Sequence, residues 1–336
     1  MHEKSSWRFH EGDEIVPGRH ATRLLGGGRR YEAYLAWDDE LHALVVVKIV
    51  RPDLVETESV RRGLAGEARA LEALNHPTVV RMFDAVLEGD RPHIVLEHLD
   101  GPRLSTLLRR YRVIVEQLLP LGLELCSALH YMHGRRFLHL DVKPRNVVMS
   151  GRPRLIDLSV AIPADAVGAI TRPIGTDAYM APEQCDPARF SEIGPPSDIW
   201  GLGATLYEAL TRSRPFPPPA KSPEAAGADR HPQLASDPFP LPRDVPGPFG
   251  DTVISCLEKR PEDRPTALEL AGALEPWVAA LPAPRLGLFR PGAKTHRSDS
   301  SVRDESILSA YSPGSNRRRL LLSGMRENRQ PQGGTR

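Results

Sequence analysis

Short apolar runs separated by glycines dominate the first third of the chain and predict a small β-sheet. Residues 20–50 alternate glycines with runs such as EAYLAW and LVVVKIV, a pattern typical of antiparallel hairpins. Residues 57–75 show helical spacing instead, and the proline of Asn75-His76-Pro77 is expected to end that helix. Two further strand-like runs, VVRMFDAV and HIVLEHL, follow. The first hundred residues therefore predict an antiparallel sheet with one helix.

Helical spacing prevails from about residue 103 onward. The run VEQLLPLGLELCSALHYMH predicts a long buried helix, and SDIWGLGATLYEALT is apolar on nearly every side, as expected in a core. Between these runs, VVMSGRPRLIDL predicts two short strands around a Ser-Gly-Arg-Pro turn. Residues 215–248 are rich in proline without periodicity and predict a long surface loop. Residues 282–336 are rich in Ser, Arg, Gly and Pro and predict a disordered tail.

Composition indicates a globular cytoplasmic protein. Of the 336 residues, 40% are hydrophobic and 26% charged, and the formal net charge is +1. We expect no membrane span, because no stretch approaches the roughly 20 consecutive apolar residues that one needs. The first residues lack the layout of a signal peptide. The three cysteines are odd in number and far apart, which argues against a disulfide framework or a zinc cluster.

The charge is distributed unevenly. Residues 282–336 carry 11 Lys and Arg against 4 Asp and Glu, so a basic tail follows a mildly acidic body. Within the tail, the cluster Arg317-Arg318-Arg319 before Leu320–Leu322 could bind acidic lipid, nucleic acid or a protein. A solvated tail has the same composition, and we favour that interpretation. We therefore expect no nucleic-acid partner.

Two charged residues stand where the pattern calls for apolar ones. Lys48 shares one face of its predicted strand with Val46 and Val50, and Glu67 lies on the same helical stripe as Leu64. A charge on an apolar face is costly unless an opposite charge meets it. We therefore predict an ion pair between Lys48 and Glu67, rather than two unrelated side chains that reach solvent.

A cluster of polar residues follows the first long helix of this second region. The segment HLDVKPRN, residues 139–146, places Asp141, Lys143 and Asn146 in one short loop. The two strands after Asn146 fold back on each other and bring Asp157 to the same open end. An amide oxygen beside a carboxylate suits Mg²⁺, which also accepts phosphate oxygens as ligands. The spacing therefore predicts a Mg²⁺ site at Asn146 and Asp157.

These motifs, in this order, resemble those of the bacterial eukaryotic-like (Hanks-type) serine/threonine protein kinases. The resemblance covers roughly residues 17–280. It rests on the residues named above, on GTDAYMAPE at 175–183, on Asp198 in DIWG and on Arg264 in PEDRPT. It implies an α+β, bilobal protein-kinase-like fold, with a small antiparallel-sheet N-lobe that contains one key helix and a larger, mainly helical C-lobe.

The resemblance also implies a domain organisation and an activity. We expect an N-terminal extension at 1–16, an N-lobe at 17–97, a C-lobe at 98–281 that includes the proline-rich loop 215–248, and a disordered basic tail at 282–336. The implied reaction transfers the γ-phosphate of ATP to serine or threonine hydroxyls of protein substrates. The implied cofactors are ATP and Mg²⁺.

The family's catalytic roles carry over to matching positions. Lys48, positioned by Glu67, is expected to hold the α- and β-phosphates of ATP. Asp141 is expected to accept or orient the proton of the substrate hydroxyl, and Lys143 to neutralise charge on the transferring phosphate. Asn146 is expected to complete the catalytic loop and to bind Mg²⁺ together with Asp157.

Other family positions imply contacts with the nucleotide or with the scaffold. Gly26 and Gly28 are expected to let the backbone approach the phosphates. The remaining residues expected to contact the nucleotide are Ala33, Val46, Glu97, Leu99 and Val148. The residues expected to hold the scaffold are Thr176 against the Asp141 loop, Glu183 paired with Arg264, and Asp198 beneath the catalytic loop.

Three positions depart from the family pattern. Tyr31 replaces the third glycine of the glycine loop, which predicts weakened ATP binding. Leu140 replaces the arginine that usually pairs with a phosphorylated activation segment, so we expect activity to depend less on phosphorylation of Thr171 or Thr176. Autophosphorylation remains expected at these threonines or in the tail. Ser159 replaces the glycine after the metal aspartate, which predicts a stiffer hinge.

Two other functions remain open at this point. A pseudokinase-like nucleotide-binding protein, with a regulatory or scaffold role and little or no phosphotransfer, fits the three departures. A small-molecule kinase of similar fold is disfavoured, because the segment ending in YMAPE and Arg264 together build a peptide-docking platform. All five groups that touch ATP, metal or acceptor hydroxyl are present, so we favour an active protein kinase.

Overall fold

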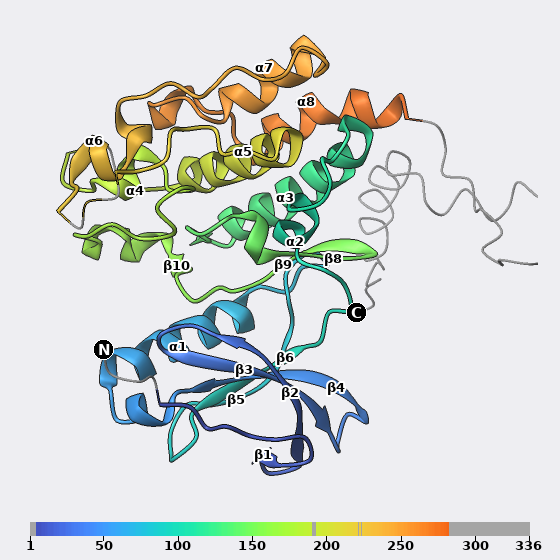
Figure 1. Cartoon of the computed structure of the whole chain (residues 1–336), viewed down its shortest axis with the longest axis vertical. Helices are drawn as coiled ribbons and strands as arrows, with labels where there is room; N and C mark the ends of the chain where they lie inside the picture. Colours follow the sequence, from blue (N-terminus) through green and yellow to red (C-terminus); the bar gives the residue numbers. More distant parts are fainter. Residues whose placement is uncertain (1–4, 190–192, 221, 223, 282–336) are drawn as a thin grey trace, which may run out of the picture. The chain divides into compact units, whose positions relative to one another are not determined.

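Six strands of the first hundred residues form one antiparallel sheet in the order β1-β2-β3-β4-β6-β5 (Figure 1). Their bounds are β1 Glu14–Val16, β2 Arg19–Gly27, β3 Tyr31–Asp38, β4 Ala43–Val50, β5 Met82–Val86 and β6 His93–Glu97. On β4, Val45, Val47 and Ile49 are fully buried on one face, while Val46 and Lys48 alternate with them on the other. Because side chains alternate along a strand, Lys48 lies on the same face as Val46, which is the face of the candidate active site.

The structure is a computed structural model that describes residues 5–189, 193–220, 222 and 224–281. One compact unit extends to Pro282. The predicted tail lies outside the described residues, so its predicted disorder stays a prediction. Within the described part of the chain, no helix combines the length and the apolar character needed to cross a membrane.

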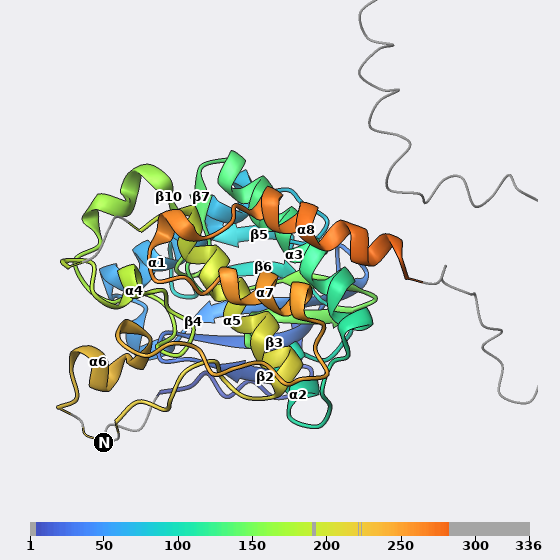
Figure 2. The ribbon, with the colours of Figure 1, turned by 90° about the horizontal axis from the view of Figure 1, so that it is seen from above.

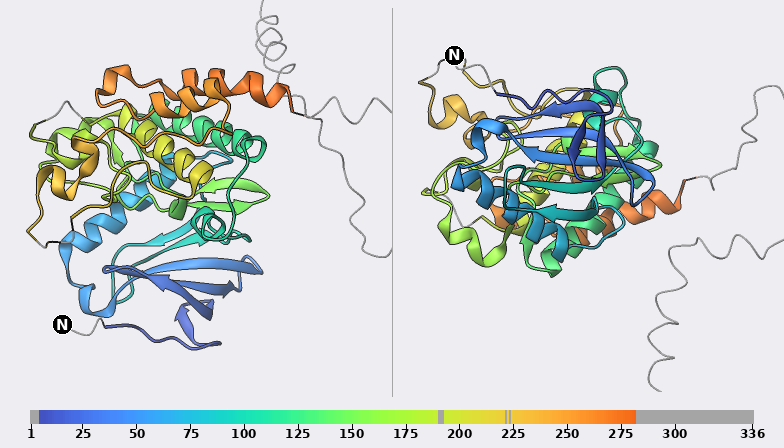
Figure 3. Two further views of the ribbon diagram at one scale, coloured as in Figure 1. Left: turned by 45° about the horizontal axis from the view of Figure 1, so that its top comes forward. Right: turned by 90° about the horizontal axis from the view of Figure 1, so that it is seen from below.

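Helix α1, Glu58–Ala73, lies between the sheet and the helical part of the chain (Figures 1 and 3). Its buried face includes Val60, Leu64, Ala68 and Leu71, which follow helical spacing. The helix ends shortly before Pro77, as the sequence predicts. Glu67 lies among these apolar residues and is 1% exposed.

Helices α3, Val115–Gly134, and α5, Pro195–Thr211, form the centre of the C-lobe. Helix α5 is buried along almost its whole length, because its apolar residues cover every side. Helices α7, Gly247–Ser255, and α8, Ala267–Ala279, lie on the far side of this pair from the sheet (Figures 1 and 2). The shorter helices are α2 Leu104–Leu108, α4 Pro182–Cys185 and α6 Gly227–Arg230.

Two further sheets have two strands each. Strands β8, Val147–Ser150, and β9, Arg152–Leu155, pair as the predicted hairpin, and β7, Phe137–Leu138, pairs with β10, Ile162–Pro163. The predicted α+β bilobal kinase fold, with its curled antiparallel sheet and helical lobe, is therefore confirmed.

The prediction of a plain surface loop at 215–248 is wrong in part. This segment contains α6 and several buried side chains. Phe216 stacks on Trp200 with ring centroids 5.3 Å apart, and the Gln233 amide donates hydrogen bonds to the carbonyls of Asp177 (2.6 Å) and Met180 (3.1 Å). Single anchors of this kind carry no periodicity, so the sequence pattern did not indicate them.

The predicted N-terminal extension packs on the N-lobe. The indole N–H of Trp7 donates a hydrogen bond of 2.8 Å to the Val50 carbonyl, and its ring stacks on Phe9. Ile15 and Val16 are buried, and β1 pairs with β2 along the edge of the sheet. Residues 5–16 are therefore part of the packing of this lobe.

Candidate active site

The Lys48 ammonium is surrounded by carboxylates. Its Nζ lies 2.8 and 2.7 Å from the two oxygens of Glu67 and 3.1 Å from Oδ1 of Asp157. Strand β4 supplies the lysine, α1 the glutamate, and the segment after β9 the aspartate. The structure thus brings together three residues that the sequence had placed in one site, from positions 19 and 109 residues apart.

Lys48 and the carboxylates beside it stabilise one another, although burial and the charge of Asp157 raise the pKa of Glu67. Burial alone would lower the pKa of Lys48, but Glu67 and Asp157 raise it above its ordinary value. Burial alone would raise the pKa of Asp157, but Lys48 and a hydrogen bond from the Ser159 side chain bring it well below its ordinary value. Lys48 and Asp157 are therefore both charged at neutral pH. Ser159, one of the three departures, contributes to this state.

Asp141, the predicted catalytic aspartate, is the centre of a hydrogen-bond cluster. The Asp141 carboxylate accepts from Lys143 Nζ at 2.5 Å, from Thr176 Oγ1 at 2.7 Å and from Asn146 Nδ2 at 3.0 Å. Lys143 also reaches Thr176 Oγ1 at 2.5 Å. These contacts fix both carboxylate oxygens of Asp141, and they bring Thr176 against the loop as the sequence predicts.

A buried aspartate supports this loop from beneath. Asp198 on α5 accepts the backbone N–H groups of His139 (2.9 Å) and Leu140 (2.7 Å), and His133 Nε2 lies 2.9 Å from its carboxylate. Burial opposes ionisation, but His133 and the N–H of His139 lower the pKa of Asp198 below its ordinary value. The loop that carries Asp141 is therefore held by a fixed negative charge.

The oxygen groups predicted for a metal lie at one end of the β8–β9 hairpin. The N–H of Ile156 donates to the carbonyl of Asn146 at 2.8 Å, so Asn146 and Asp157 end adjacent strands. The Asn146 amide nitrogen donates to Asp141, which turns its amide oxygen away from that bond. An amide oxygen and an ionised carboxylate are hard donors that fit a divalent cation. The described residues hold no cluster of three His, Cys, Asp or Glu side chains suited to a metal.

The glycine loop is fixed from the side by a buried arginine. Arg51 donates from Nε to the carbonyl of Gly28 at 3.0 Å and from Nη1 to Glu32 at 2.8 Å. Gly26 has a positive φ of 146°, which a glycine accepts without strain. Sequence reasoning missed this pair, although Glu32 occupies the buried face of β3 and could have been flagged in the same way as Glu67.

The remaining predicted nucleotide contacts divide between the two lobes. Val46 and Ala33 lie on the Lys48 face of the sheet, because Ala33 pairs directly with Lys48. Val148 is buried on β8, in the other lobe. The Glu97 side chain is bonded to Arg154 and to the N–H of Arg81. The Glu97 carboxylate is thus already bonded, which leaves its backbone groups for the predicted contact with adenine.

The activation segment packs on apolar residues around Leu140. Leu138, Leu140 and Ile193 form a buried cluster, against which Val160, Ile162, Val167, Ile170 and Ile174 pack. Gln184, which sequence reasoning also missed, donates to the carbonyls of Leu140 (2.8 Å) and Ile174 (2.9 Å). Apolar packing and this amide therefore hold the segment at the position where the family usually has an arginine.

The comparisons with known proteins agree with this geometry. A family model described as the protein kinase domain matches residues 19–277. The chain belongs to the protein kinase family. It is 34% identical over 266 residues to the serine/threonine-protein kinase PknB of Mycolicibacterium smegmatis and 33% identical over 266 residues to PknB of Mycobacterium tuberculosis. Each match covers 75% of this chain and 41% of the relative.

The serine/threonine-protein kinase PknD of Chlamydia abortus is 27% identical over 327 residues, 87% of this chain and 34% of the relative. The chain thus spans less than half the length of these relatives. Membership of the Hanks-type serine/threonine kinases is confirmed, and this family generally uses ATP with a divalent metal ion.

Proposed function

We propose that the chain is an active serine/threonine protein kinase that uses ATP with Mg²⁺. The observation that carries the proposal is the closed Lys48–Glu67 pair, whose lysine also contacts Asp157. Phosphoryl transfer depends on positioning and charge neutralisation, and this pair must be formed for both. Asn146 and Asp157 would hold the Mg²⁺, which would neutralise charge on the phosphates.

The catalytic loop supplies the remaining groups of the reaction. The hydroxyl oxygen of the substrate forms a bond to the γ-phosphorus while the bond from that phosphorus to the β–γ bridging oxygen breaks, so ADP leaves. Asp141 accepts the proton of the hydroxyl, and Lys143, 2.5 Å from Asp141, neutralises charge on the transferring phosphoryl group. Gly26 and Gly28 contribute backbone contacts to the phosphates.

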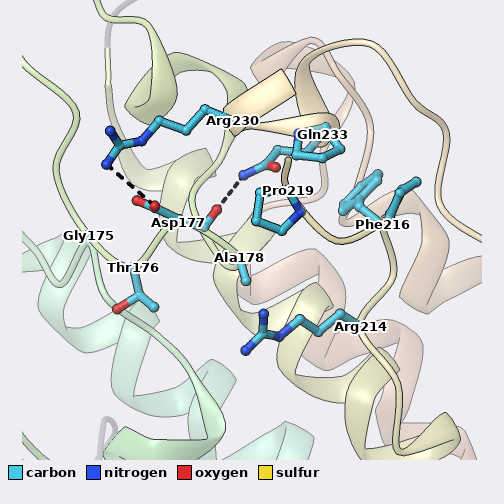
Figure 4. Close-up of a pocket in the computed structure, with 11 residues that line it drawn as sticks. Gly175, Thr176, Asp177, Ala178, Arg214, Phe216, Pro219, Arg230 and Gln233 are labelled. Carbon is cyan, nitrogen blue, oxygen red and sulfur yellow. Dashed lines mark hydrogen bonds and ion pairs between the residues drawn. The ribbon is translucent and has the colours of Figure 1, made fainter. Parts of the chain in front are cut away.

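A cavity beside Thr176 supports a peptide as the substrate. It measures about 480 Å³ and lies where the end of the activation segment meets the segment after α5 (Figure 4). Its lining includes Arg214, Phe216 and Arg230, and Arg230 lies 3.6 Å from the Asp177 carboxylate. A small-molecule substrate would need no such surface outside the phosphate site, so the cavity favours the protein kinase.

Regulation by the activation segment follows from the contacts of its threonines. Thr171 is exposed, whereas the hydroxyl of Thr176 is bonded to Asp141 and Lys143. Of the two predicted autophosphorylation sites, we therefore favour Thr171. Because apolar residues surround Leu140, we expect activity to depend less on a phosphate on Thr171 than is usual in the family. We also propose a cytoplasmic location for the chain.

Radiolabelled ATP with a generic protein substrate tests the proposal. The full chain should transfer phosphate to serine and threonine, and Asp141→Asn should lose at least about a hundredfold in rate, because the general base is removed. Nucleotide binding without transfer, at equal levels in the parent and Asp141→Asn, would support the pseudokinase instead. The three departures favour that alternative, but they leave Lys48, Asp141 and Asp157 in place.

A further inference from the structure

Tyr31 joins the glycine loop to helix α1. It is the first residue of β3, directly after the loop, and its hydroxyl donates a hydrogen bond of 3.0 Å to the carbonyl of Val60 on α1. The centre of its ring lies 5.1 Å from Nζ of Lys48. Burial raises the pKa of the Tyr31 hydroxyl, so it remains a protonated donor. Tyr31 thus links the strand that follows the glycine loop to the catalytic lysine and to the helix that carries Glu67.

Helix α1 has a space for this hydroxyl. A Cβ atom on Gly63 would lie 2.9 Å from the Tyr31 oxygen, closer than such contacts normally come. Val60, Gly63 and Glu67 follow one another at intervals of three and four residues, so they share one face of the helix. The tyrosine ring therefore covers the same stripe of α1 from which Glu67 reaches Lys48.

We propose that Tyr31 is a positioning residue that holds α1 where Glu67 meets Lys48. The inference rests on the proposed kinase activity, because it concerns the population of the closed pair that phosphoryl transfer needs. It assigns a purpose to the tyrosine at the third glycine position, where the sequence alone suggested only weakened ATP binding. With Leu140 in an apolar cluster, this contact on the N-lobe side restrains α1 without any phosphate.

The strength of the effect follows from the loss of one hydrogen bond. A typical bond of this kind shifts an equilibrium by roughly threefold to tenfold. Tyr31→Phe keeps the ring against Lys48 but removes the donor to Val60. We expect amide exchange in residues 58–73 to become threefold to tenfold faster in the nucleotide-free protein, and kcat to fall by a similar factor while KM for the protein substrate stays constant.

A second tyrosine provides the matched control. The Tyr207 hydroxyl donates to the carbonyl of Phe239, also at 3.0 Å, in the other lobe. Tyr207→Phe therefore removes a tyrosine-to-backbone bond of equal length that does not touch α1. It should leave kcat and the exchange of residues 58–73 within twofold of the parent, whatever it does to global stability.

Gly63→Ala tests the same contact from the helix. The new methyl group displaces the Tyr31 hydroxyl, so Gly63→Ala should protect α1 less than the preference of alanine for helix, about 1 kcal/mol over glycine, would give by itself. In the Tyr31→Phe background the methyl group has room, and adding Gly63→Ala should then cause no further increase. Such non-additivity is the signature of two changes that break one interaction.

The inference is overturned if Tyr31→Phe exchanges α1 at the parental rate, or if the effects of Tyr31→Phe and Gly63→Ala simply add. Exchange is read without ATP or substrate, so it tests Tyr31 even in a chain that transfers no phosphate. Faster exchange with no transfer in the parent would sustain the role of Tyr31 and reject the proposed activity. Normal phosphate transfer by the parent, with amide exchange unchanged in Tyr31→Phe, would support the proposed activity and reject the role of Tyr31.

Discussion

Arg264 and Glu183 form a two-pronged ion pair that is almost completely sealed from solvent. Nη1 and Nη2 of Arg264 lie 2.7 and 2.9 Å from the two oxygens of Glu183, and the two side chains are 0% and 1% exposed. Ser197 on α5 donates a third bond to the same carboxylate. The end of the activation segment is thereby fixed to the core of the C-lobe by a buried, fully bonded ion pair.

Breaking this pair should lower stability severely. Arg264→Met leaves the Glu183 charge buried without its partner, which costs on the order of 3–5 kcal/mol in the free energy of unfolding. Urea denaturation measures the loss. Arg260→Met is the control, because Arg260 and Glu262 form an exposed pair expected to contribute less than about 1 kcal/mol. Equal losses in the two variants would contradict the buried role of Arg264.

Restoring the family's usual arginine at position 140 should harm this protein. Leu140 is 3% exposed among Leu138, Ile193 and Ile174, so Leu140→Arg buries an unpaired charge in an apolar cluster. We expect a loss of several kcal/mol in unfolding free energy, on the scale of other buried unpaired charges, whereas Leu140→Met should cost less than about 1.5 kcal/mol. Thermal denaturation compares them. A stable Leu140→Arg variant that gains activity on phosphorylation would refute this account.

Removing Arg51 should weaken ATP binding more than turnover. Its guanidinium holds the Gly28 carbonyl and Glu32, so Arg51→Met frees the glycine loop and strands a buried carboxylate. We expect KM for ATP to rise roughly threefold to tenfold, the equivalent of one lost hydrogen bond. Steady-state kinetics measures it. Arg19→Met removes an equally covered arginine of the same sheet, paired with Asp38, and should leave KM for ATP unchanged.

Low pH should remove the contribution of the Asp198 carboxylate to the free energy of unfolding. Its pKa is lower in the folded protein than in the unfolded chain, so its stabilisation is complete above the unfolded value of about 4 and is lost as pH falls through the folded value. Asp198→Asn should therefore cost most at pH 7 and progressively less below about pH 4. Urea denaturation across this range tests the trend. A loss of stability that does not depend on pH would show that the negative charge of Asp198 is not responsible for it. Asp251→Asn, on the exposed side of α7, serves as the control.

Most of the fold and the central site could be predicted from sequence because the signals were local. The alternation of β4 placed Lys48 on the face opposite Val47, and the stripe of α1 placed Glu67 inward. The β8–β9 hairpin joined Asn146 to Asp157 through a turn that the residue types specify. In each case a period or a turn carried the information.

The contacts that escaped prediction depend on single residues from distant segments. In the sequence, Tyr31 indicates only that a glycine is missing. The structure shows that Gly63 leaves room for its hydroxyl. Gln233 lies in a segment without periodicity, and its hydrogen bond to the Asp177 carbonyl is evident only from the folded structure. Arg51 follows directly after an apolar strand, and nothing in the pattern tells whether it turns to solvent or to the glycine loop.

The position of Trp7 bears on how this protein is best handled in the laboratory. The kinase match begins at residue 19, and a gene trimmed to that limit would discard Trp7, Phe9 and the strand with Ile15. It would also discard Ser5, whose carbonyl binds Arg51 at 2.7 Å. Shortened versions of the protein should therefore keep everything from Ser5 onward.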